Sequence, residues 1–341
     1  MKCRISLEIL DEKGDYILVS DRILVTGGAG YVGSVVVAEL LERGHRVRVL
    51  DSLTHGSIPS LLLAWGRDQF EFIRGDVRDP ALRGRALDDV GAVVHLAAIV
   101  GDPACARQPD LARNVNLDAT AALAAEAAAA GVARFLFSST CSNYGKMNGA
   151  DFIDEDGELA PVSLYAETKV AAEREVLARG DGSIATCCLR FATVFGASPR
   201  MRFDLTVNEF ARDVSLQGHL LVYGEQFWRP YIHVRDVARA VVLALEADVA
   251  AIRGQVFNVG DTQENYRKLD IVELLEQRFP GARFEYVHKE EDPRDYRVSF
   301  EKFGRELGFN AQRSVAEGID EVVTLLNSGL IDDPYAPVYS N

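Results

Sequence analysis

Short apolar runs and longer helix-like stretches alternate along most of the chain. Five apolar runs of strand length begin at Arg22, Arg46, Phe70, Ala92 and Arg134. Between them the sequence is helical in pattern, as at residues 35–43, or rich in alanine, as at 114–131. Alternation at this spacing predicts an α/β fold with a parallel, doubly wound sheet, in which ligands bind at the carboxyl ends of the strands.

A glycine-rich segment, TGGAGYVG, joins the first apolar run to the helical pattern that follows it. A strand that turns sharply into a helix beneath a diphosphate needs residues without a Cβ, and Gly27, Gly30 and Gly33 meet that need, although a glycine triplet alone also occurs in structural turns. Asp51 ends the second run, where an acid would bind ribose hydroxyls and favour NAD over NADP. Asp76 either bonds an adenine amine or begins a helix before Pro80.

The composition is that of a globular protein, with 341 residues of which 48% are hydrophobic. A formal net charge of −14 argues against nucleic acid as a partner, since phosphate backbones bind basic surfaces. Any anionic ligand must therefore be held by local arginines. No apolar stretch reaches the length of a membrane span and the N-terminus does not resemble a signal peptide, so we expect a cytoplasmic protein without membrane contact. The five cysteines suggest neither a disulfide framework nor a metal site.

A polar run, SSTCSNYG, follows the fifth predicted strand, and further on PVSLYAETK opens another helix. Tyr165 and Lys169 lie four residues apart and so project from one face of that helix. A phenol with a pKa of about 10 is a poor base at neutral pH, and a nearby ammonium stabilises its anion. Lowering this pKa to about 7 requires about 4 kcal/mol from Lys169 and a cationic nicotinamide together. A YxxxK pair alone also occurs on solvated helices.

Together these segments resemble the extended short-chain dehydrogenase/reductases, specifically the NAD-dependent sugar-nucleotide epimerase/dehydratase family. The resemblance rests on the ordered segments TGGAGYVG, HLAA, SSTCSNYG, YAETK, LRFATVFG and RPYIHVRDVARA. It implies an N-terminal extension at residues 1–21 and an NAD-binding Rossmann-type domain at 22–192 with strands from about 229–260. A smaller, interleaved C-terminal α/β substrate lobe would span 193–341. Family members are commonly homodimers joined through two helices, here residues 114–131 and 165–179.

The resemblance also implies catalytic and cofactor-binding roles. Tyr165 would remove the proton of a sugar hydroxyl, usually O4, while the carbon-bound hydrogen leaves as hydride to NAD. Thr140 would share a hydrogen bond with that oxygen, and Lys169 would hold the nicotinamide ribose. The remaining cofactor contacts are expected from Gly27, Gly30, Tyr31, Val32, Gly33, Asp51, Asp76, Val77, Leu96, Ala97, Ala98, Asn116, Ser138 and Phe191, with Tyr165 and Lys169 among them.

A nucleoside diphosphate sugar is the substrate class that the resemblance implies, with segment 199–210 lining the nucleotide pocket. Arg229 and Arg294 are expected at the diphosphate, because a planar guanidinium can bind two phosphate oxygens at once. Thr193 stands where many relatives have an asparagine, which leaves that contact in doubt. The expected substrate contacts are Thr140, Thr193, Asn208, Val222, Arg229 and Arg294.

The two residues after Thr140 bear on the reaction. In the related 4,6-dehydratases they are an Asp and a Glu, whereas here they are Cys141 and Ser142, which favours a simple 4-epimerase. Some relatives that epimerise C3 and C5 use a cysteine in this loop as an acid/base, so Cys141 is either a catalytic candidate or a small buried residue. A 4-keto-sugar reductase and a non-catalytic NAD-binding sensor are further alternatives. The intact Tyr165, Lys169 and Thr140 argue against a sensor.

Overall fold

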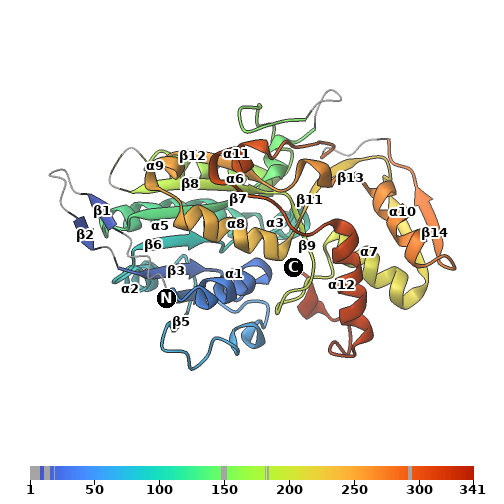
Figure 1. Cartoon of the computed structure of the whole chain (residues 1–341), viewed down its shortest axis with the longest axis horizontal. Coiled ribbons are helices and arrows are strands. Elements are labelled where there is room, and N and C mark those ends of the chain that lie inside the picture. The colour runs from blue at the N-terminus through green and yellow to red at the C-terminus, as the bar shows by residue number, and fades with distance from the viewer. Residues whose placement is uncertain are drawn as a thin grey trace.

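A computed structural model describes residues 8–10, 16–18, 20–146, 152–180, 182, 184–290 and 294–341. Near its N-terminus the strands β1 (Glu8–Leu10) and β2 (Tyr16–Leu18) pair antiparallel. The other described residues form two lobes, a larger α/β lobe and beside it a smaller one (Figure 1). The smaller lobe carries α7 (Thr206–Gln217), α10 (Lys268–Arg278), β14 (Arg283–Val287) and α12 (Val315–Asn327).

The larger lobe is built on a seven-stranded parallel sheet in the order β12-β8-β7-β6-β3-β4-β5. Its strands are β3 (Arg22–Thr26), β4 (Arg46–Asp51), β5 (Phe70–Arg74), β6 (Ala92–His95), β7 (Arg134–Thr140), β8 (Ala185–Phe191) and β12 (Gln255–Val259). The strand order reverses at β3, so the predicted doubly wound fold is confirmed and the ligand-binding crevice lies beyond the carboxyl ends of β3 and β6.

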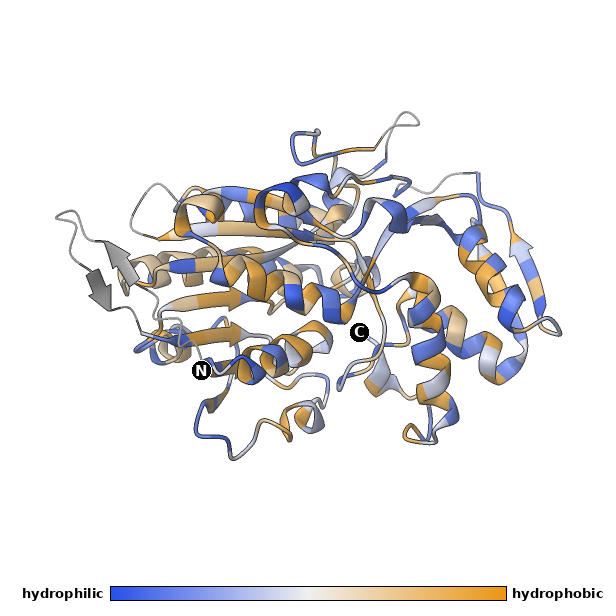
Figure 2. Ribbon diagram, viewed as in Figure 1, coloured by the Kyte–Doolittle hydropathy of each residue, from blue (hydrophilic) through white to orange (hydrophobic). Residues whose placement is uncertain are grey.

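Helices cover both faces of this sheet, and each face has its own apolar core. On one face α1 (Tyr31–Glu42) and α8 (Val234–Glu246) pack against the strands through residues such as Val37 and Val241. On the other face lie α2 (Pro80–Leu87), α5 (Ala119–Ala129) and α6 (Leu164–Leu177). Apolar positions accordingly run along the strands and the helix faces toward them (Figure 2). Burial on both faces explains why the strands are continuous apolar runs rather than alternating ones.

The helix predicted at residues 114–131 begins differently from the expectation. Residues Asn114–Asp118 form one wide π-helical turn, and the regular helix α5 starts only at Ala119. Two short helices, α3 (Asp102–Arg107) and α4 (Pro109–Arg113), come directly before that turn. A π-helical turn is often found beside a functional site, and the connection through α3 lines the cavity described below.

The smaller lobe has a third apolar core and two small sheets, β13-β11-β9 and β10-β14. Its elements are β9 (Thr193–Phe195), α7 (Thr206–Gln217), β10 (His219–Tyr223), β11 (Trp228–His233), β13 (Asn265–Arg267), α10 (Lys268–Arg278), β14 (Arg283–Val287) and α12 (Val315–Asn327). The chain returns to the larger lobe in α8, α9 (Val249–Ile252), β12 and α11 (Glu301–Leu307). Of residues 229–260, β12 joins the large sheet, whereas β11 pairs inside the smaller lobe.

Short 3-10 turns complete the described chain at Ile58–Leu61, Cys141–Tyr144, Thr262–Glu264 and Pro337–Tyr339. Over the described ranges, no helix combines the length and the apolar character that crossing a membrane requires.

Candidate active site

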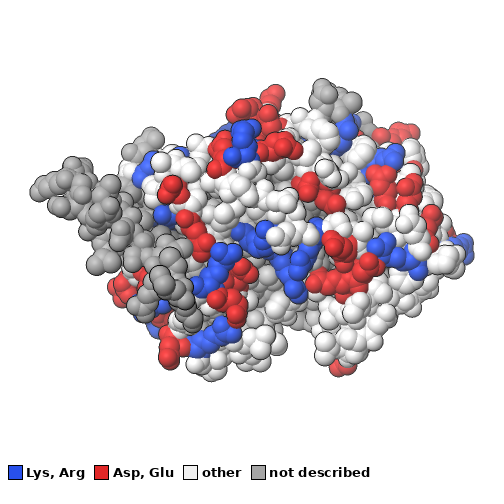
Figure 3. Space-filling model, viewed as in Figure 1, with Lys and Arg blue, Asp and Glu red and all other residues white. Residues whose placement is uncertain are grey.

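A cavity of about 760 Å³ lies at the carboxyl ends of the central strands, between the sheet and the smaller lobe. Its volume is typical of sites for ligands the size of a cofactor with a small substrate. The larger lobe contributes the glycine-rich turn, the ends of β4 to β7 and the start of α6, and the smaller lobe contributes residues of β9 and of segment 200–206. Acidic and basic side chains are interspersed over the outer face that Figure 3 shows.

The glycine-rich turn has the shape that its sequence predicts. Gly27 has a φ of +72°, and a Cβ on it would lie 2.7 Å from the backbone nitrogen of Ala97. A Cβ on Gly33 would overlap the carbonyl oxygen of Gly27, so the helix can approach the strand only because both residues are glycine. Helix α1 follows Gly30 at its N-cap, and among the described residues no side chain caps it. Its first N–H groups are therefore available to an anion, and the cradle fits a dinucleotide diphosphate.

Two acids mark the adenosine end of this cradle. The carboxylate of Asp51 accepts hydrogen bonds from the backbone nitrogens of Ala29 (2.9 Å) and Leu53 (2.8 Å), which fix it at the cavity wall. Asp76 also lines the cavity, and its pair with Arg78 holds the pKa of this carboxyl below its ordinary value. The alternative that Asp76 caps a helix is wrong, because Asp79 is the residue that caps α2.

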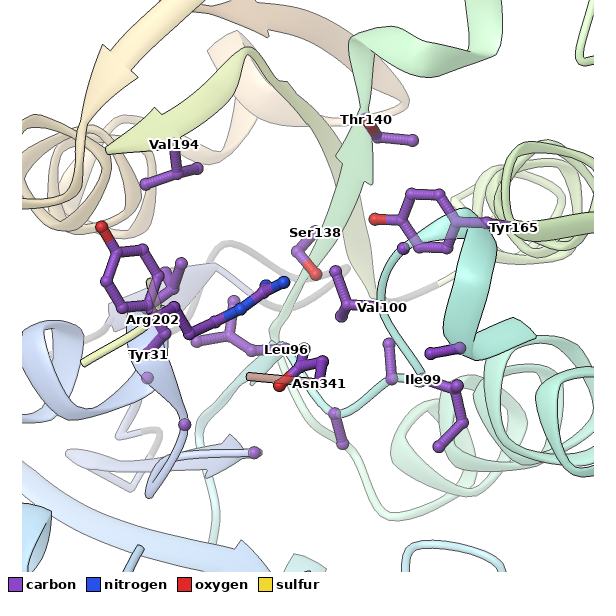
Figure 4. Close-up of a pocket in the computed structure, with 18 of the residues that line it drawn as sticks. Tyr31, Leu96, Ile99, Val100, Ser138, Thr140, Tyr165, Val194, Arg202 and Asn341 are labelled. Atoms are coloured by element: carbon purple, nitrogen blue, oxygen red, sulfur yellow. The ribbon is translucent and has the colours of Figure 1, made fainter. Parts of the chain in front are cut away.

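Tyr165, Thr140 and Lys169 converge at the other end of the cavity. Thr140 is the last residue of β7, and Tyr165 is the second residue of α6, whose N-cap Ser163 accepts a hydrogen bond from the backbone of Ala166. Figure 4 shows the Tyr165 hydroxyl directed into the cavity, with Thr140 and Ser138 on the neighbouring strand. Lys169 is buried, and its Nζ donates a 2.8 Å hydrogen bond to the carbonyl oxygen of Ser138.

The electrostatics of this group differ from the expectation in the absence of ligands. Burial raises the pKa of the Tyr165 phenol, while the charge of Arg202 and a hydrogen bond with Thr140 act in the opposite direction. Lys169 is not among the leading groups that lower it, and burial lowers the pKa of Lys169 itself to about 8. The predicted effect of Lys169 on the phenol therefore finds no support in the ligand-free protein, where burial shifts the pKa of each group toward its neutral form.

Most residues predicted for the site line this one cavity. For the cofactor they are Gly27, Gly30, Tyr31, Val32, Gly33, Asp51, Asp76, Val77, Leu96, Ala97, Ala98, Ser138, Tyr165, Lys169 and Phe191. For the substrate they are Thr140, Thr193, Arg229 and Arg294. Arg229 lies with its guanidinium 5.5 Å from the ring centroid of Tyr296, and Arg294 pairs with Asp102 at 3.0 Å.

Four predicted residues lie outside the described cavity lining, each because its side chain packs elsewhere. Cys141 is buried with its Sγ donating to the carbonyl of Arg190 at 3.2 Å, and burial raises the pKa of the thiol, so an acid/base role is not supported. Val222 is part of the core of the smaller lobe.

The two asparagines among these four hold backbone in place. The amide of Asn116 bonds both the N–H and the carbonyl of Ile99, a residue of the cavity wall. Asn208 is fully buried and bonds the N–H of Gly196, the carbonyl of Arg202 and the hydroxyl of Tyr31. Both asparagines therefore shape the wall without facing the ligand.

Several lining residues were not singled out from the sequence. They come from five separate stretches and are His55, Arg200, Arg202, Lys268, Tyr296 and Asn341. The two arginines lie inside segment 199–210, which was expected to line a nucleotide pocket, and a charge pattern of PRMR in so acidic a chain was a signal for an anion site. Asn341 lies far along the chain from every motif, so no local pattern identifies it.

Comparisons with known proteins agree with this geometry. A model described as "NAD dependent epimerase/dehydratase family" matches residues 23–260. A UDP-glucose 4-epimerase of Bacillus subtilis is 30% identical over 321 residues, covering 86% of this chain and 94% of that protein. A 3 beta-hydroxysteroid dehydrogenase/Delta 5→4-isomerase of Mycobacterium tuberculosis is 37% identical over 225 residues, covering 63% of this chain and 57% of that protein. The crystal structure of DesIV, a dTDP-glucose 4,6-dehydratase from Streptomyces venezuelae with NAD and TYD bound, aligns with a TM-score of 0.81 and 27% identity over 90% of this chain and 97% of that one.

Proposed function

The chain belongs to the NAD-dependent epimerase/dehydratase family with NAD as its cofactor, and we propose that it is a nucleotide-sugar epimerase acting through a transient 4-keto sugar, most simply a 4-epimerase. One observation carries the proposal. Tyr165, Thr140 and Lys169 meet at one end of a cavity whose wall in the smaller lobe is lined with arginines. A hydroxyl-activating group and an anion-binding wall facing one space fit a sugar joined to a diphosphate.

Each side chain of this group has a role that its contacts support. NAD, when bound, accepts a hydride from the substrate and returns it. Tyr165 takes the proton of the sugar hydroxyl and later gives it back, and Thr140 donates a hydrogen bond at the same oxygen. Lys169, whose Nζ is held at the carbonyl of Ser138, presents its remaining N–H donors toward a ribose. The rigid strand and helix that carry these groups supply the positioning.

Recognition of the substrate diphosphate falls to Arg229 and Arg294, and Thr193 lines the same cavity. Each has a contact that orients it: Arg229 donates to the carbonyl of Trp228 at 2.7 Å, and Arg294 pairs with Asp102. A guanidinium held in this way can still bind a phosphate, because it has five N–H donors and these contacts do not use all of them.

The absence of a carboxyl pair after Thr140 favours an epimerase over a 4,6-dehydratase. Elimination across C5 and C6 needs an acid and a base, and the residues at these positions are Cys141, which packs away from the cavity, and Ser142. The same packing weakens the case for C3 or C5 epimerisation by Cys141. A keto-sugar reductase would consume one reduced cofactor per turnover, whereas an epimerase restores NAD in each cycle.

The relative that oxidises steroids supports a second candidate, an NAD-dependent hydroxysteroid dehydrogenase. Arg229 and Arg294 of the cavity wall argue against it, because they are the cations assigned to the substrate and a sterol carries no anionic group for them to bind.

One experiment separates these functions. The protein is incubated with NAD and, separately, with UDP-, dTDP-, GDP- and CDP-sugars or a 3β-hydroxysteroid, while NADH absorbance is followed and sugar products are identified by NMR. We expect an inverted sugar without net NADH. Net NADH from the steroid would establish the dehydrogenase, and a 6-deoxy-4-keto product would establish the dehydratase.

We also propose a homodimer through α5 and α6, which light scattering would test.

A further inference from the structure

Two buried arginines line the cavity from the smaller lobe in an arrangement that the proposed chemistry does not use. Arg200 and Arg202 are 5% and 8% exposed. Arg202 makes a two-pronged pair with Asp204, at 2.9 and 2.6 Å. Arg200 donates through one Nη to the carbonyl of Ser340 at 3.1 Å, and its buried Nε has no hydrogen-bond partner in the described part of the chain. Asp204 therefore pairs with Arg202, and in the described part of the chain no carboxylate pairs with Arg200.

The surroundings of this pair are short of negative charge. Burial and the charge of Arg202 lower the pKa of Arg200 to about 10. Burial, and after it the charges of both arginines, lower the pKa of His55, another residue of the cavity wall. The other nearby acid is Asp51, whose carboxylate is already bonded to two backbone nitrogens. A buried N–H without an acceptor costs free energy that an anionic ligand would recover.

The position of Arg200 and Arg202 in the cavity indicates which anionic ligand they bind. Arg200 lies near Asp51 and His55, at the adenosine end of the cavity, and Arg202 interacts with both Tyr31 and Tyr165. In Figure 4 the guanidinium of Arg202 points into the cavity, toward the side on which Tyr165 lies. The two guanidinium groups therefore extend from the ribose acid toward the catalytic tyrosine. The uncapped first turn of α1 begins at Tyr31, between those two ends.

A segment from the far end of the sequence holds these arginines. The carbonyl of Tyr339 accepts from the backbone nitrogen of Phe203 at 2.8 Å, and the carbonyl of Ser340 accepts from Arg200. The backbone nitrogen of Asn341 donates to Asp204 at 3.2 Å, and its carbonyl oxygen accepts from Arg107 of the larger lobe at 3.1 Å. Residues 339–341 therefore brace the arginine segment and join it to the opposite lobe.

We propose that Arg200 and Arg202, braced by residues 339–341, are the second half of the diphosphate site: they bind the cofactor's diphosphate from the smaller lobe, opposite the N-terminus of α1. The substrate also carries a diphosphate that two arginines could bind. We assign the pair to the cofactor's diphosphate instead, because the two arginines lie between Asp51 and Tyr165 over the glycine-rich turn. The site thereby retains NAD through contacts from both lobes.

Arg200→Gln is the decisive variant, because it removes the cation with the unpaired Nε and leaves the Arg202–Asp204 pair intact. Dissociation constants of the full chain are measured for NAD, ADP and adenosine by displacement of NADH fluorescence, and for UDP by calorimetry. We expect NAD and ADP to weaken at least tenfold, while adenosine, which lacks phosphates, and UDP are unchanged. Arg200→Lys should recover part of the loss. Removing Ser340 and Asn341 should speed NADH release.

The melting temperature without ligand separates this role from a structural one. Removing one of two like charges predicts that Arg200→Gln melts no lower than the parent but gains less from added NAD. A lower melting temperature with unchanged NAD and ADP affinities would assign the arginine to structure and overturn the proposal. Weakened UDP with unchanged NAD would assign the pair to the substrate and overturn it equally. Arg305→Gln is the matched control, because Arg305 is exposed in α11 and pairs with Glu306.

Discussion

Replacing Tyr165 by Phe tests the centre of the proposed chemistry with the smallest structural change. The substitution removes one hydroxyl and keeps the ring that fills the start of α6. Among described residues the phenol has a hydrogen bond with Thr140, whose hydroxyl oxygen also accepts from the backbone nitrogen of Ser142 at 3.1 Å. Thr140 therefore keeps a partner in the variant, and the loss of stability should be about 1 kcal/mol.

The loss of activity should be much larger. General acid–base transfer by a positioned group contributes about 10²- to 10⁴-fold, which is about 3 to 5.5 kcal/mol of transition-state stabilisation. We therefore expect kcat/KM of Tyr165→Phe to fall by at least a hundredfold while the affinities for NAD and sugar nucleotide stay within a few-fold. Because burial raises the phenol's pKa, activity of the parent should also increase with pH until the phenol ionises in the complex.

Tyr144→Phe is the matched control for losing a buried phenolic hydroxyl. The Tyr144 hydroxyl donates to Asn258 and accepts from Arg190, both at 2.8 Å, outside the cavity lining. Its removal should cost about 1–3 kcal/mol of stability and leave kcat/KM of the folded protein unchanged. The assay follows product by NMR or a coupled reaction at saturating NAD. If Tyr165→Phe keeps more than about a tenth of the parent kcat/KM, a loss below about 1.4 kcal/mol, the base lies elsewhere.

Four further predictions use other parts of the site. NAD should bind at least tenfold more tightly than NADP, because a 2′-phosphate beside the carboxylate of Asp51 should cost more than about 1.4 kcal/mol; equal affinities by calorimetry would contradict this. Lys169 has a pKa of about 8 in the folded protein against an ordinary value of 10.5, so between pH 8 and 10.5 the unfolded chain binds more protons than the folded one. The free energy that Lys169 contributes to stability should therefore rise by about 3 kcal/mol over this range. Denaturant unfolding at several pH values checks this, and the rise should be missing in Lys169→Met. Glu173→Gln should cost about 3–5 kcal/mol in the same assay, because it leaves Arg190 buried without its charge partner; a loss below about 1 kcal/mol would refute this. Cys141→Ser should stay nearly as active as the parent and product made in D2O should carry no deuterium on carbon; solvent deuterium at C3 or C5 that the serine variant abolishes would restore Cys141 as a catalytic group.

The sequence predicts the larger lobe well because its strands are buried on both faces. Such strands are continuous apolar runs, and all five predicted runs begin in the structure at the residues expected, which are Arg22, Arg46, Phe70, Ala92 and Arg134. The glycine-rich turn is equally predictable from the sequence, since its backbone leaves no room for a Cβ at Gly27 and Gly33. The π-helical turn at Asn114–Asp118 was not predicted, because a change of hydrogen-bond register leaves no signature in an apolar, alanine-rich stretch.

Orientation explains the errors within the site. Thr140 has extended backbone and lines the cavity, but the chain turns into the 3-10 helix Cys141–Tyr144 directly after it, which buries Cys141 against the carbonyl of Arg190 while Ser142 lines the cavity. The alternation of an extended strand therefore does not predict which of these side chains face the cavity. The roles of Asn116 and Asn208 were not predicted either, because each asparagine bonds backbone that lies 17 or 12 residues away along the chain.

Two cations of the cavity, Lys169 and Arg200, share one physical property, which links catalysis to ligand binding. Lys169 and Arg200 are buried where burial disfavours their charge, and the Nε of Arg200 is buried without an acceptor in the described chain. The free protein therefore carries an electrostatic cost that an anionic ligand relieves. A ligand that binds only the folded state stabilises it by about 2.7 kcal/mol at a hundred times its dissociation constant. The chain has a net charge of −14, so the rest of the molecule repels an anion. An anion therefore binds at the cavity, where these buried cations are.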